Sequence, residues 1–257
     1  MRTIHVIGIG AGDPEQLTLQ AVRALRDTDV FFILDKGEVK SDLTGLRRDM
    51  LDAHVPEGTY RIVEARDPDR DRSAGGAAYS PAVGDWRSAR AGIYARLIAE
   101  ELGEDETGAF LVWGDPALYD STLAILEEVL ASGTVAFAYD VIPGISSVSS
   151  LAARHRTGLN RVARPVQITT GRRLAEGFPD GVDDVVVMLD AHQCFRQYAD
   201  EDLDIYWGAY LGTPDEILVS GPIAEAAPRI ERLRAEARER KGWIMDTYLL
   251  RRNPRER

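Results

Sequence analysis

Short apolar runs rich in β-branched residues alternate with amphipathic stretches through residues 1–160. This alternation predicts an α/β architecture in which parallel strands are separated by helices. The apolar runs predict strands over residues 3–9, 30–34, 60–65, 110–113 and 135–141. Apolar positions three and four residues apart predict helices over residues 17–27, 43–53, 86–102, 122–131 and 146–155.

The pattern changes in the second part of the chain. Strands are predicted over residues 166–170, 185–189, 205–211, 216–220 and 243–250. Only two sizeable helices, near residues 192–199 and 224–240, separate them, and this ratio favours a partly antiparallel sheet. We therefore expect two unlike α/β domains, residues 1–160 with a mainly parallel sheet and residues 161–257 with a mixed sheet.

Composition narrows the class of protein. The chain has 257 residues and a formal net charge of −11, which argues against a nucleic-acid partner because such binding neutralises phosphates. No apolar run approaches the roughly 20 residues of a membrane span, and the N-terminus leads directly into a strand rather than a signal peptide. Cys194 is the single cysteine, and the four histidines are scattered, so we expect neither a disulfide nor a metal site. These features predict a cytoplasmic protein.

The segment GIGAGDP at residues 8–14 follows the first predicted strand. Its three alternating glycines permit a tight turn and a close approach of main-chain N–H groups to a ligand. A dinucleotide fingerprint would need glycine at position 13, where Asp13 stands, and Pro14 follows it. A carboxylate repels a pyrophosphate, so the loop indicates a ligand other than NAD, such as one with an ammonium group or a sugar. An unliganded surface turn is the alternative.

Three further segments also lie where predicted strands end, which is where open α/β sheets bind ligands. They are WGDPALY at residues 113–119, IPGISS at 142–147, and the pair formed by 187–190 and 211–216 in the second domain. Each has a simpler interpretation. Gly-Asp-Pro is common in turns, Ser146 or Ser147 caps the next helix, and Met188 and Leu189 pack in a core.

The motifs GIGAGDPEQLT, GDPALY, IPGISS and GTPDE, in this order, resemble the tetrapyrrole (corrin/porphyrin) methylase family over essentially the whole chain. The resemblance implies a homodimer that binds S-adenosyl-L-methionine, with S-adenosyl-L-homocysteine as product, between two unlike α/β domains. The family usually has Tyr-Met near residues 188–190, so the register of that contact is open by one or two residues. The resemblance places cofactor contacts at Pro14, Gly114, Asp115, Leu118, Ser146, Ser147, Leu189 and Gly212. The loops that contain them add Gly8, Gly10 and Trp113 as predicted cofactor-binding residues.

Within the family, residues 63–90 form a segment that most relatives have in a shorter form. Together with FILDKG at residues 32–37, it resembles the member that methylates C-1 of precorrin-5 in cobalamin biosynthesis and releases the ring acetyl group as acetate. The alternatives are a methylase acting on another precorrin carbon or a diphthine synthase-like enzyme. A nicotinamide dehydrogenase and a binding module without turnover are the alternatives from other classes.

Arginines are concentrated in this region. Residues 61–96 contain seven arginines and five acidic residues, and forked guanidinium groups suit the carboxylates of a precorrin substrate. The alternative is a solvated loop, because the chain has only three lysines and uses arginine as its usual cation. The expected substrate contacts are Arg66, Arg70, Arg72, Arg87 and Arg90. Asp35, Tyr79, Asp85 and Tyr119 are candidates to assist acetate release, and the sequence does not choose among them.

Overall fold

A computed structural model describes residues 1–35, 41–68 and 79–253, except for the side chains of residues 41, 42, 44 and 79–83. The chain forms two compact units. The first contains residues 1–10 and 14–145, and the second contains residues 11–13 and 146–257. No helix among the described residues is long and apolar enough to cross a membrane.

The first unit is built on a five-stranded sheet in the order β3-β2-β4-β1-β5. Every neighbouring pair is parallel, so the carboxyl ends of all five strands lie at one edge. The strands are β1 (Thr3–Gly8), β2 (Val30–Asp35), β3 (Arg61–Arg66), β4 (Thr107–Val112) and β5 (Ala138–Ile142).

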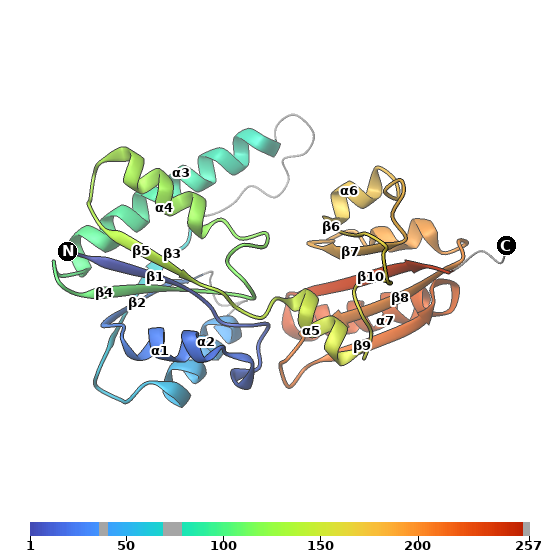
Figure 1. The fold of residues 1–257 in the computed structure, drawn as a ribbon, viewed down its shortest axis with the longest axis horizontal. Helices are drawn as coiled ribbons and strands as arrows, with labels where there is room; N and C mark the ends of the chain where they lie inside the picture. Colours follow the sequence, from blue (N-terminus) through green and yellow to red (C-terminus); the bar gives the residue numbers. More distant parts are fainter. Residues whose placement is uncertain (36–40, 69–78, 254–257) are drawn as a thin grey trace. The chain divides into compact units, whose positions relative to one another are not determined.

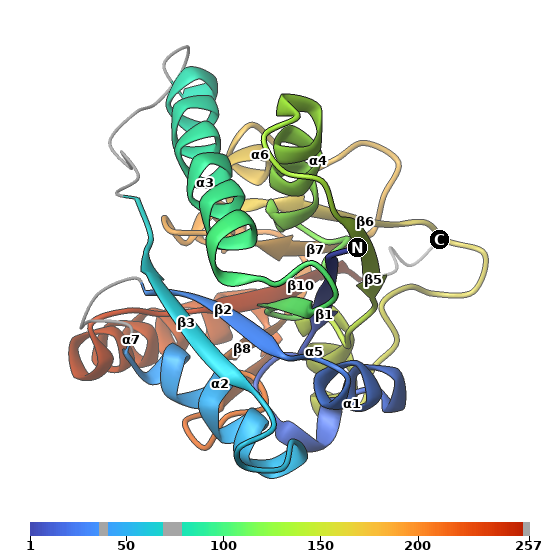
Figure 2. The same ribbon diagram turned by 90° about the vertical axis from the view of Figure 1, so that its left-hand side faces the viewer.

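Helices cover both faces of this sheet, with α3 (Tyr79–Glu101) and α4 (Thr122–Ser132) on one face (Figures 1 and 2). The opposite face carries α1 (Leu19–Arg26) and α2 (Ser41–His54). Side chains of β1 point alternately to the two faces of the sheet and pack in two hydrophobic cores. Ile4 and Val6 belong to the core that includes α3, and Ile7 belongs to the core that includes α1. The near-continuous apolar strands follow from this burial on both sides.

The second unit has a five-stranded mixed sheet in the order β6-β7-β10-β8-β9. The strands are β6 (Val166–Thr170), β7 (Asp184–Met188), β8 (Leu203–Ala209), β9 (Ile217–Pro222) and β10 (Asp246–Arg252). Strand β6 is parallel to β7, and β10 is antiparallel to both β7 and β8. The carboxyl ends of β6, β7 and β8 therefore share one edge, where β10 begins.

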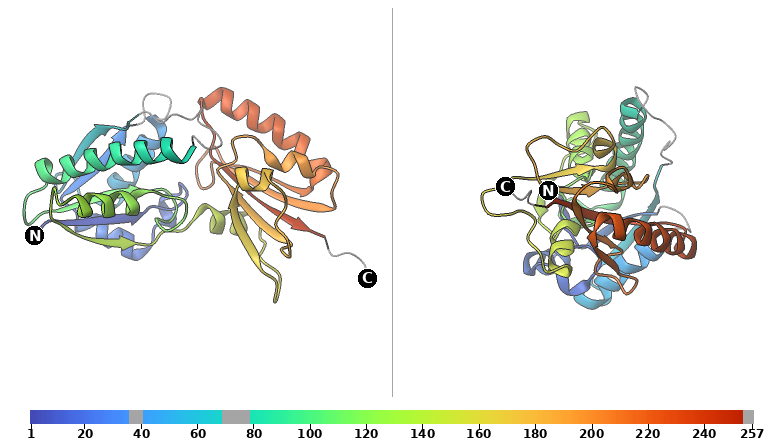
Figure 3. Two further views of the ribbon diagram at one scale, coloured as in Figure 1. Left: turned by 90° about the horizontal axis from the view of Figure 1, so that it is seen from above. Right: turned by 90° about the vertical axis from the view of Figure 1, so that its right-hand side faces the viewer.

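Two helices cover opposite faces of the second sheet (Figure 3). Helix α7 (Ile223–Lys241) packs on the face that carries Trp207, whose indole shares Asp246 with Arg234 of that helix. Helix α5 (Ser147–Arg154) packs on the other face, where a Cβ on Gly208 would lie 3.0 Å from Leu151. Because α5 packs on β8 and β10, the units divide between Ile145 and Ser146, whereas the sequence placed the boundary near Arg161.

The predicted architecture is confirmed, with a parallel sheet in the first unit and a mixed sheet in the second. Some local elements differ. Helix α3 begins at Tyr79 rather than at residue 86. The helix expected near residues 192–199 is a short 3-10 helix, η4 (Cys194–Tyr198), preceded by the left-handed Gln193 with φ 58°. Helix α6 (Gly171–Ala175) was not predicted, since five residues are too few to show a helical period.

Candidate functional site

The glycine-rich loop of the first unit pairs with the loop that follows β4. The N–H of Gly114 donates to the carbonyl of Gly10 at 2.8 Å, and the N–H of Gly10 donates back at 3.3 Å. Both residues are left-handed, with φ 75° and 67°, which glycine adopts without steric cost. These two N–H groups bond to the chain itself. Contact of the two glycines with a ligand therefore stays a prediction that other backbone atoms would have to fulfil.

Gly8 and Gly144 bring the ends of β1 and β5 against the same loop. A Cβ on Gly144 would lie 2.1 Å from the carbonyl oxygen of Gly114, and one on Gly8 would lie 2.5 Å from the nitrogen of Gly144. Asp115 braces the junction because its Oδ2 accepts the N–H of Gly144 at 3.0 Å and its Oδ1 that of Ala117 at 2.8 Å. Three strand ends are thus locked together by backbone contacts that only glycine allows.

Apolar and aromatic side chains surround this junction within the first unit. Leu118 is half-buried, and Pro14 begins a short 3-10 turn, Pro14–Gln16. Tyr119 is left-handed at φ 53° and 46% exposed. The Nε1 of Trp113 is buried and has no acceptor among the described residues.

In the second unit, Leu189 directly follows β7 at the edge where β8 also ends. It adopts φ 55°, and its side chain is 66% exposed. A left-handed backbone costs a non-glycine residue roughly 1–2 kcal/mol. Strain of this kind is often found at functional sites, and Leu189 stays a predicted cofactor contact.

A buried polar network fixes the residue after Leu189. The carboxylate of Asp190 accepts the N–H groups of His192 at 3.0 Å and Cys194 at 2.6 Å, and the hydroxyl of Tyr248 at 2.6 Å. Arg234 donates to the carbonyl of Asp190 at 3.0 Å. Burial, reinforced by Asp190, raises the pKa of the Cys194 thiol to about 12, so this cysteine stays neutral.

Arg234 connects this network to a buried ion pair with Asp246. Its Nε lies 3.0 Å from the carboxylate, and the two side chains are only 6% and 8% exposed. Burial raises the pKa of Asp246, while Arg234 and the indole of Trp207 act in the opposite direction. The backbone next to the exposed Leu189 is therefore held by buried hydrogen bonds and an ion pair.

The remaining predicted contacts of the second unit also have structural roles. Ser146 caps α5, as predicted for one of the two serines, because its Oγ accepts the N–H of Ser149 at 3.3 Å. Gly212 is left-handed at φ 76°, and a Cβ there would lie 2.9 Å from the nitrogen of Asp13. Residues 11–13 pack against this loop, which explains why they cluster with the second unit.

Comparison with known proteins assigns the family. The model of the Tetrapyrrole (Corrin/Porphyrin) Methylases matches residues 3–227. The chain belongs to this family. It is 54% identical to a protein named "Precorrin-6A synthase [deacetylating]" from Sinorhizobium sp over 251 residues, which are 98% of this chain and 95% of that protein.

Two solved structures are similar to this chain to different degrees. A "putative cobalamin synthesis related protein (CobF)" from Corynebacterium diphtheriae is 40% identical, with a TM-score of 0.83 and coverage of 98% of each chain. A uroporphyrin-III-C-methyltransferase from Thermus thermophilus is 18% identical, covers 97% of this chain and 92% of its own, and has a TM-score of 0.63. At that identity the likeness shows the shared fold alone.

The arginines expected to bind the substrate of this tetrapyrrole methylase have different environments. Arg66 ends β3 and is exposed, whereas Arg87 on α3 pairs with Glu128 at 3.3 Å. Arg90 is buried, forms an ion pair with Asp67 at 2.7 Å and lies over the ring of Trp86. The structure gives Arg90 the role of a buried brace, and its contact with substrate stays a prediction. Arg70 and Arg72 lie outside the described residues.

The candidates for acetate release are spread around the carboxyl edge of the first sheet. Asp35 ends β2 and is exposed, and Asp85 is exposed on α3. Burial raises the pKa of Tyr119, so its phenol stays protonated and can donate a hydrogen bond at neutral pH. The side chain of Tyr79 lies outside the described residues. No described group of histidine, cysteine and acidic residues could hold a metal ion.

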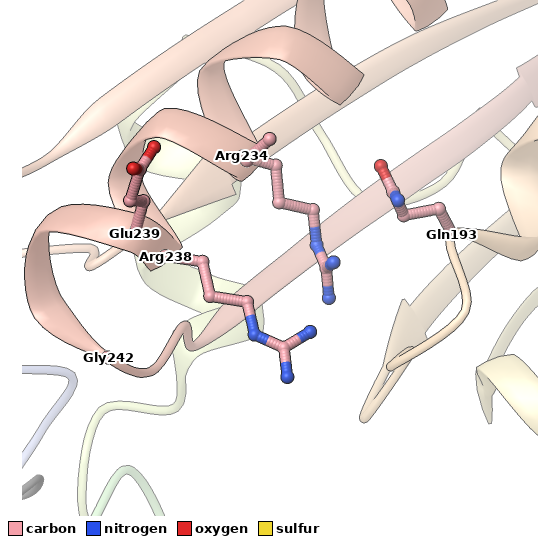
Figure 4. Close-up of a pocket in the computed structure, with 6 residues that line it drawn as sticks. Gln193, Arg234, Arg238, Glu239 and Gly242 are labelled. Atoms are coloured by element: carbon pink, nitrogen blue, oxygen red, sulfur yellow. The ribbon is translucent and has the colours of Figure 1, made fainter.

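The second unit contains a pocket of about 450 Å³ that the sequence motifs did not predict (Figure 4). Arg234 and Arg238 extend from α7 toward the loop that carries Gln193. The Oε1 of Gln193 is buried with no donor among the described residues. Spacing does not reveal this grouping, because the loop and the helix are distant in the sequence and only the fold brings them together.

Proposed function

We propose that the protein is an S-adenosyl-L-methionine-dependent C-methyltransferase of cobalamin biosynthesis. It methylates C-1 of precorrin-5 and releases acetate to give precorrin-6A. The observation that carries this proposal is the 54% identity to a deacetylating precorrin-6A synthase along 98% of the chain. That similarity covers both units and all four strand-end motifs.

We assign the binding of S-adenosyl-L-methionine to the strand-end loops predicted from the sequence. When bound, this cofactor supplies a methyl group on a sulfonium, and in-line transfer of that group requires alignment more than side-chain chemistry. Leu189 offers an exposed apolar surface to a flat base, and the polar network beneath it keeps that surface in place. In the first unit, the Gly10–Gly114 bridge fixes the backbone to which Trp113 and Leu118 are attached.

Release of acetate requires a water molecule at the acetyl carbonyl and a group that accepts its proton. Asp35 and Asp85 are exposed carboxylates that can accept a proton, and Tyr119 can donate a hydrogen bond to the carbonyl oxygen. We assign Arg66, Arg70, Arg72 and Arg87 as residues that bind the carboxylates of the macrocycle. The enzyme is further proposed to work as a cytoplasmic homodimer.

A methylase for a different precorrin carbon is the second candidate. A protein from Rhodococcus erythropolis named "Precorrin-4 C(11)-methyltransferase" is 26% identical over 248 residues. The lower identity favours the first candidate, and a diphthine synthase-like activity would need a protein substrate in place of a pigment.

One incubation separates these functions. The purified protein is mixed with S-adenosyl-L-methionine and precorrin-5, and the products are analysed by mass spectrometry and by an acetate assay. The expected product has gained one methyl group and lost one acetyl group, with one acetate formed per turnover. A methylated product that retains its acetyl group would assign a different carbon. No methylation of the pigment, by a folded protein that binds S-adenosyl-L-homocysteine, would reject the proposal.

A further inference from the structure

The first unit contains a small cavity next to the glycine junction, with Trp113 in its lining. It has a volume of about 90 Å³ and lies at the carboxyl ends of β2 and β4. Its apolar wall is formed by strand residues 32–34 and 110–112, and its polar lining comes from helices and loops. The polar and aromatic lining consists of Arg47, Arg90, Tyr94, Trp113, Asp120 and Thr122.

Arg47 of α2 is the exceptional residue of this cavity. Its Nη1 donates to the carbonyl of Leu43 at 3.1 Å and its Nε to that of Leu111 at 3.4 Å. No described carboxylate forms an ion pair with it, and its Nη2 donates to no described protein atom. Desolvation by burial lowers the pKa of Arg47 to about 10, so the side chain remains a cation at neutral pH despite the cost.

The neighbours of Arg47 compensate its charge only in part: Asp120 acts against the lowering of the Arg47 pKa by burial, and Arg90 adds to that lowering. Arg90, the second cation in the lining, is already paired with Asp67. Asp120 is exposed and accepts the main-chain N–H of Thr122 at 2.7 Å. The Arg47 guanidinium lies 5.3 Å from the centre of the Trp113 ring, whose buried Nε1 has no acceptor in the described part of the chain.

A partly desolvated guanidinium with unused donor capacity therefore lines a small cavity, with the Trp113 ring beside it. Buried donors without acceptors are rare in proteins because each one costs free energy. A carboxylate supplies the missing negative charge and up to four acceptor sites, and guanidinium groups bind it with two parallel bonds. A volume of about 90 Å³ accommodates a group of this size and excludes a whole macrocycle.

We infer that this cavity binds one carboxylate group of a ligand through Arg47. The inference rests on the proposed function for its source of carboxylates, which are the acidic side chains of the tetrapyrrole or the amino-acid end of the cofactor. Arg47 lies outside the arginine-rich segment from which substrate contacts were predicted.

Propionate tests the cavity without requiring turnover. Thermal unfolding is followed in increasing sodium propionate, with sodium chloride at matched ionic strength and neutral propionamide as references. Propionate should raise the melting temperature of the wild type, because a ligand that binds the folded state stabilises it. Arg47→Met should weaken propionate binding by about tenfold or more, and the matched variant Arg48→Met should not. Arg48 is the next residue of α2, is exposed and pairs with Glu64.

Binding and kinetic measurements then identify the source of the carboxylate. If it is a tetrapyrrole side chain, Arg47→Met raises KM for precorrin-5 about 10- to 100-fold and leaves the Kd of S-adenosyl-L-homocysteine unchanged. If it is the amino-acid end of the cofactor, the Kd of S-adenosyl-L-homocysteine rises by that factor instead. Arg47→Lys, which keeps the charge and loses the fork, should fall between the wild type and Arg47→Met.

The outcomes separate this inference from the proposed function. Wild-type behaviour of folded Arg47→Met toward propionate, precorrin-5 and S-adenosyl-L-homocysteine would overturn the carboxylate site. Equal stabilisation of the wild type by propionate and propionamide would overturn it as well. A wild-type protein that is stabilised by propionate but does not methylate precorrin-5 would support the site and reject the proposed function.

Discussion

The two units position their strand-end loops by different means. In the first unit, glycine backbones touch one another: Gly10 bonds to Gly114, and Gly144 approaches the same residue too closely for any Cβ. In the second unit, buried side chains position the loop after β7, because Tyr248 and Arg234 donate hydrogen bonds to Asp190. The glycine junction depends on the absence of side chains. The network around Asp190 depends on hydrogen bonds between buried polar groups.

This difference predicts different responses to mutation. A backbone junction cannot relax around an added methyl group, whereas a polar network loses stability in proportion to the charge left unpaired. The glycine junction should therefore respond to a gain of atoms and the network to a loss of charge.

Gly144→Ala should have the largest effect. The added Cβ would lie 2.1 Å from the carbonyl oxygen of Gly114, which is backbone and cannot move aside. We expect a loss of more than about 3 kcal/mol in the free energy of unfolding, measured by denaturant titration. Gly92→Ala is the control, since nothing lies within 4 Å of its Cβ position in α3, and alanine should stabilise that helix slightly. Equal stability of the two variants would show that the junction is not tightly packed.

Arg234→Met should cause the next largest loss in the free energy of unfolding. It leaves Asp246 buried without its ion-pair partner, which costs about 3–5 kcal/mol in comparable cases. Arg232→Met, at an exposed position of the same helix, is the control and should change stability little.

The pH dependence of Arg234→Met provides a second readout. Without Arg234, burial raises the pKa of Asp246 unopposed by its strongest partner. A carboxyl whose pKa is raised in the folded state favours folding at low pH and loses that contribution as pH rises through the folded pKa. The deficit of the variant should therefore shrink as the pH is lowered toward 4 and grow at neutral pH. A deficit independent of pH would mean that Asp246 is not the group left unpaired.

The contrast between the units also explains what the sequence could predict. The glycine loops and the strands of the first unit were predicted because their signals are local, such as left-handed glycines and apolar runs of strand length. The network around Asp190 was not, since its partners Arg234 and Tyr248 lie 44 and 58 residues away in the chain. Arg47 was missed for the same reason, as its cavity forms only when α2, α3 and β4 pack together.

Leu189→Gly should separate stability from cofactor binding. Glycine relieves the left-handed strain at φ 55°, and the exposed leucine loses little packing, so stability should stay the same or rise by about 1 kcal/mol. If Leu189 packs on the cofactor, the Kd of S-adenosyl-L-homocysteine should rise about tenfold, measured by calorimetry. Ala163→Gly relieves a similar strain at φ 57° and should leave that affinity unchanged. An unchanged Kd in Leu189→Gly would place the contact at a neighbouring residue.

Glu106→Gln should have the smallest effect and completes the comparison of ion pairs. Arg61 holds Glu106 with two bonds of 2.8 Å, yet the carboxylate side chain is 35% exposed, unlike that of the buried Asp246. The bonds from Arg61, assisted by the N–H of Gly103, lower the pKa of Glu106 to about 2. A carboxyl with a lowered pKa stabilises the fold above its unfolded value, and that contribution disappears as pH falls toward the folded pKa. Solvent screening limits the contribution to less than about 1 kcal/mol.

The wild type should therefore lose slightly more stability than Glu106→Gln between pH 5 and 2 in acid titrations followed by circular dichroism. Glu104→Gln, for which no ion pair is seen in the described part of the chain, should follow the wild-type curve. A loss as large as that of Arg234→Met would show that exposure does not separate the two kinds of pair in this protein.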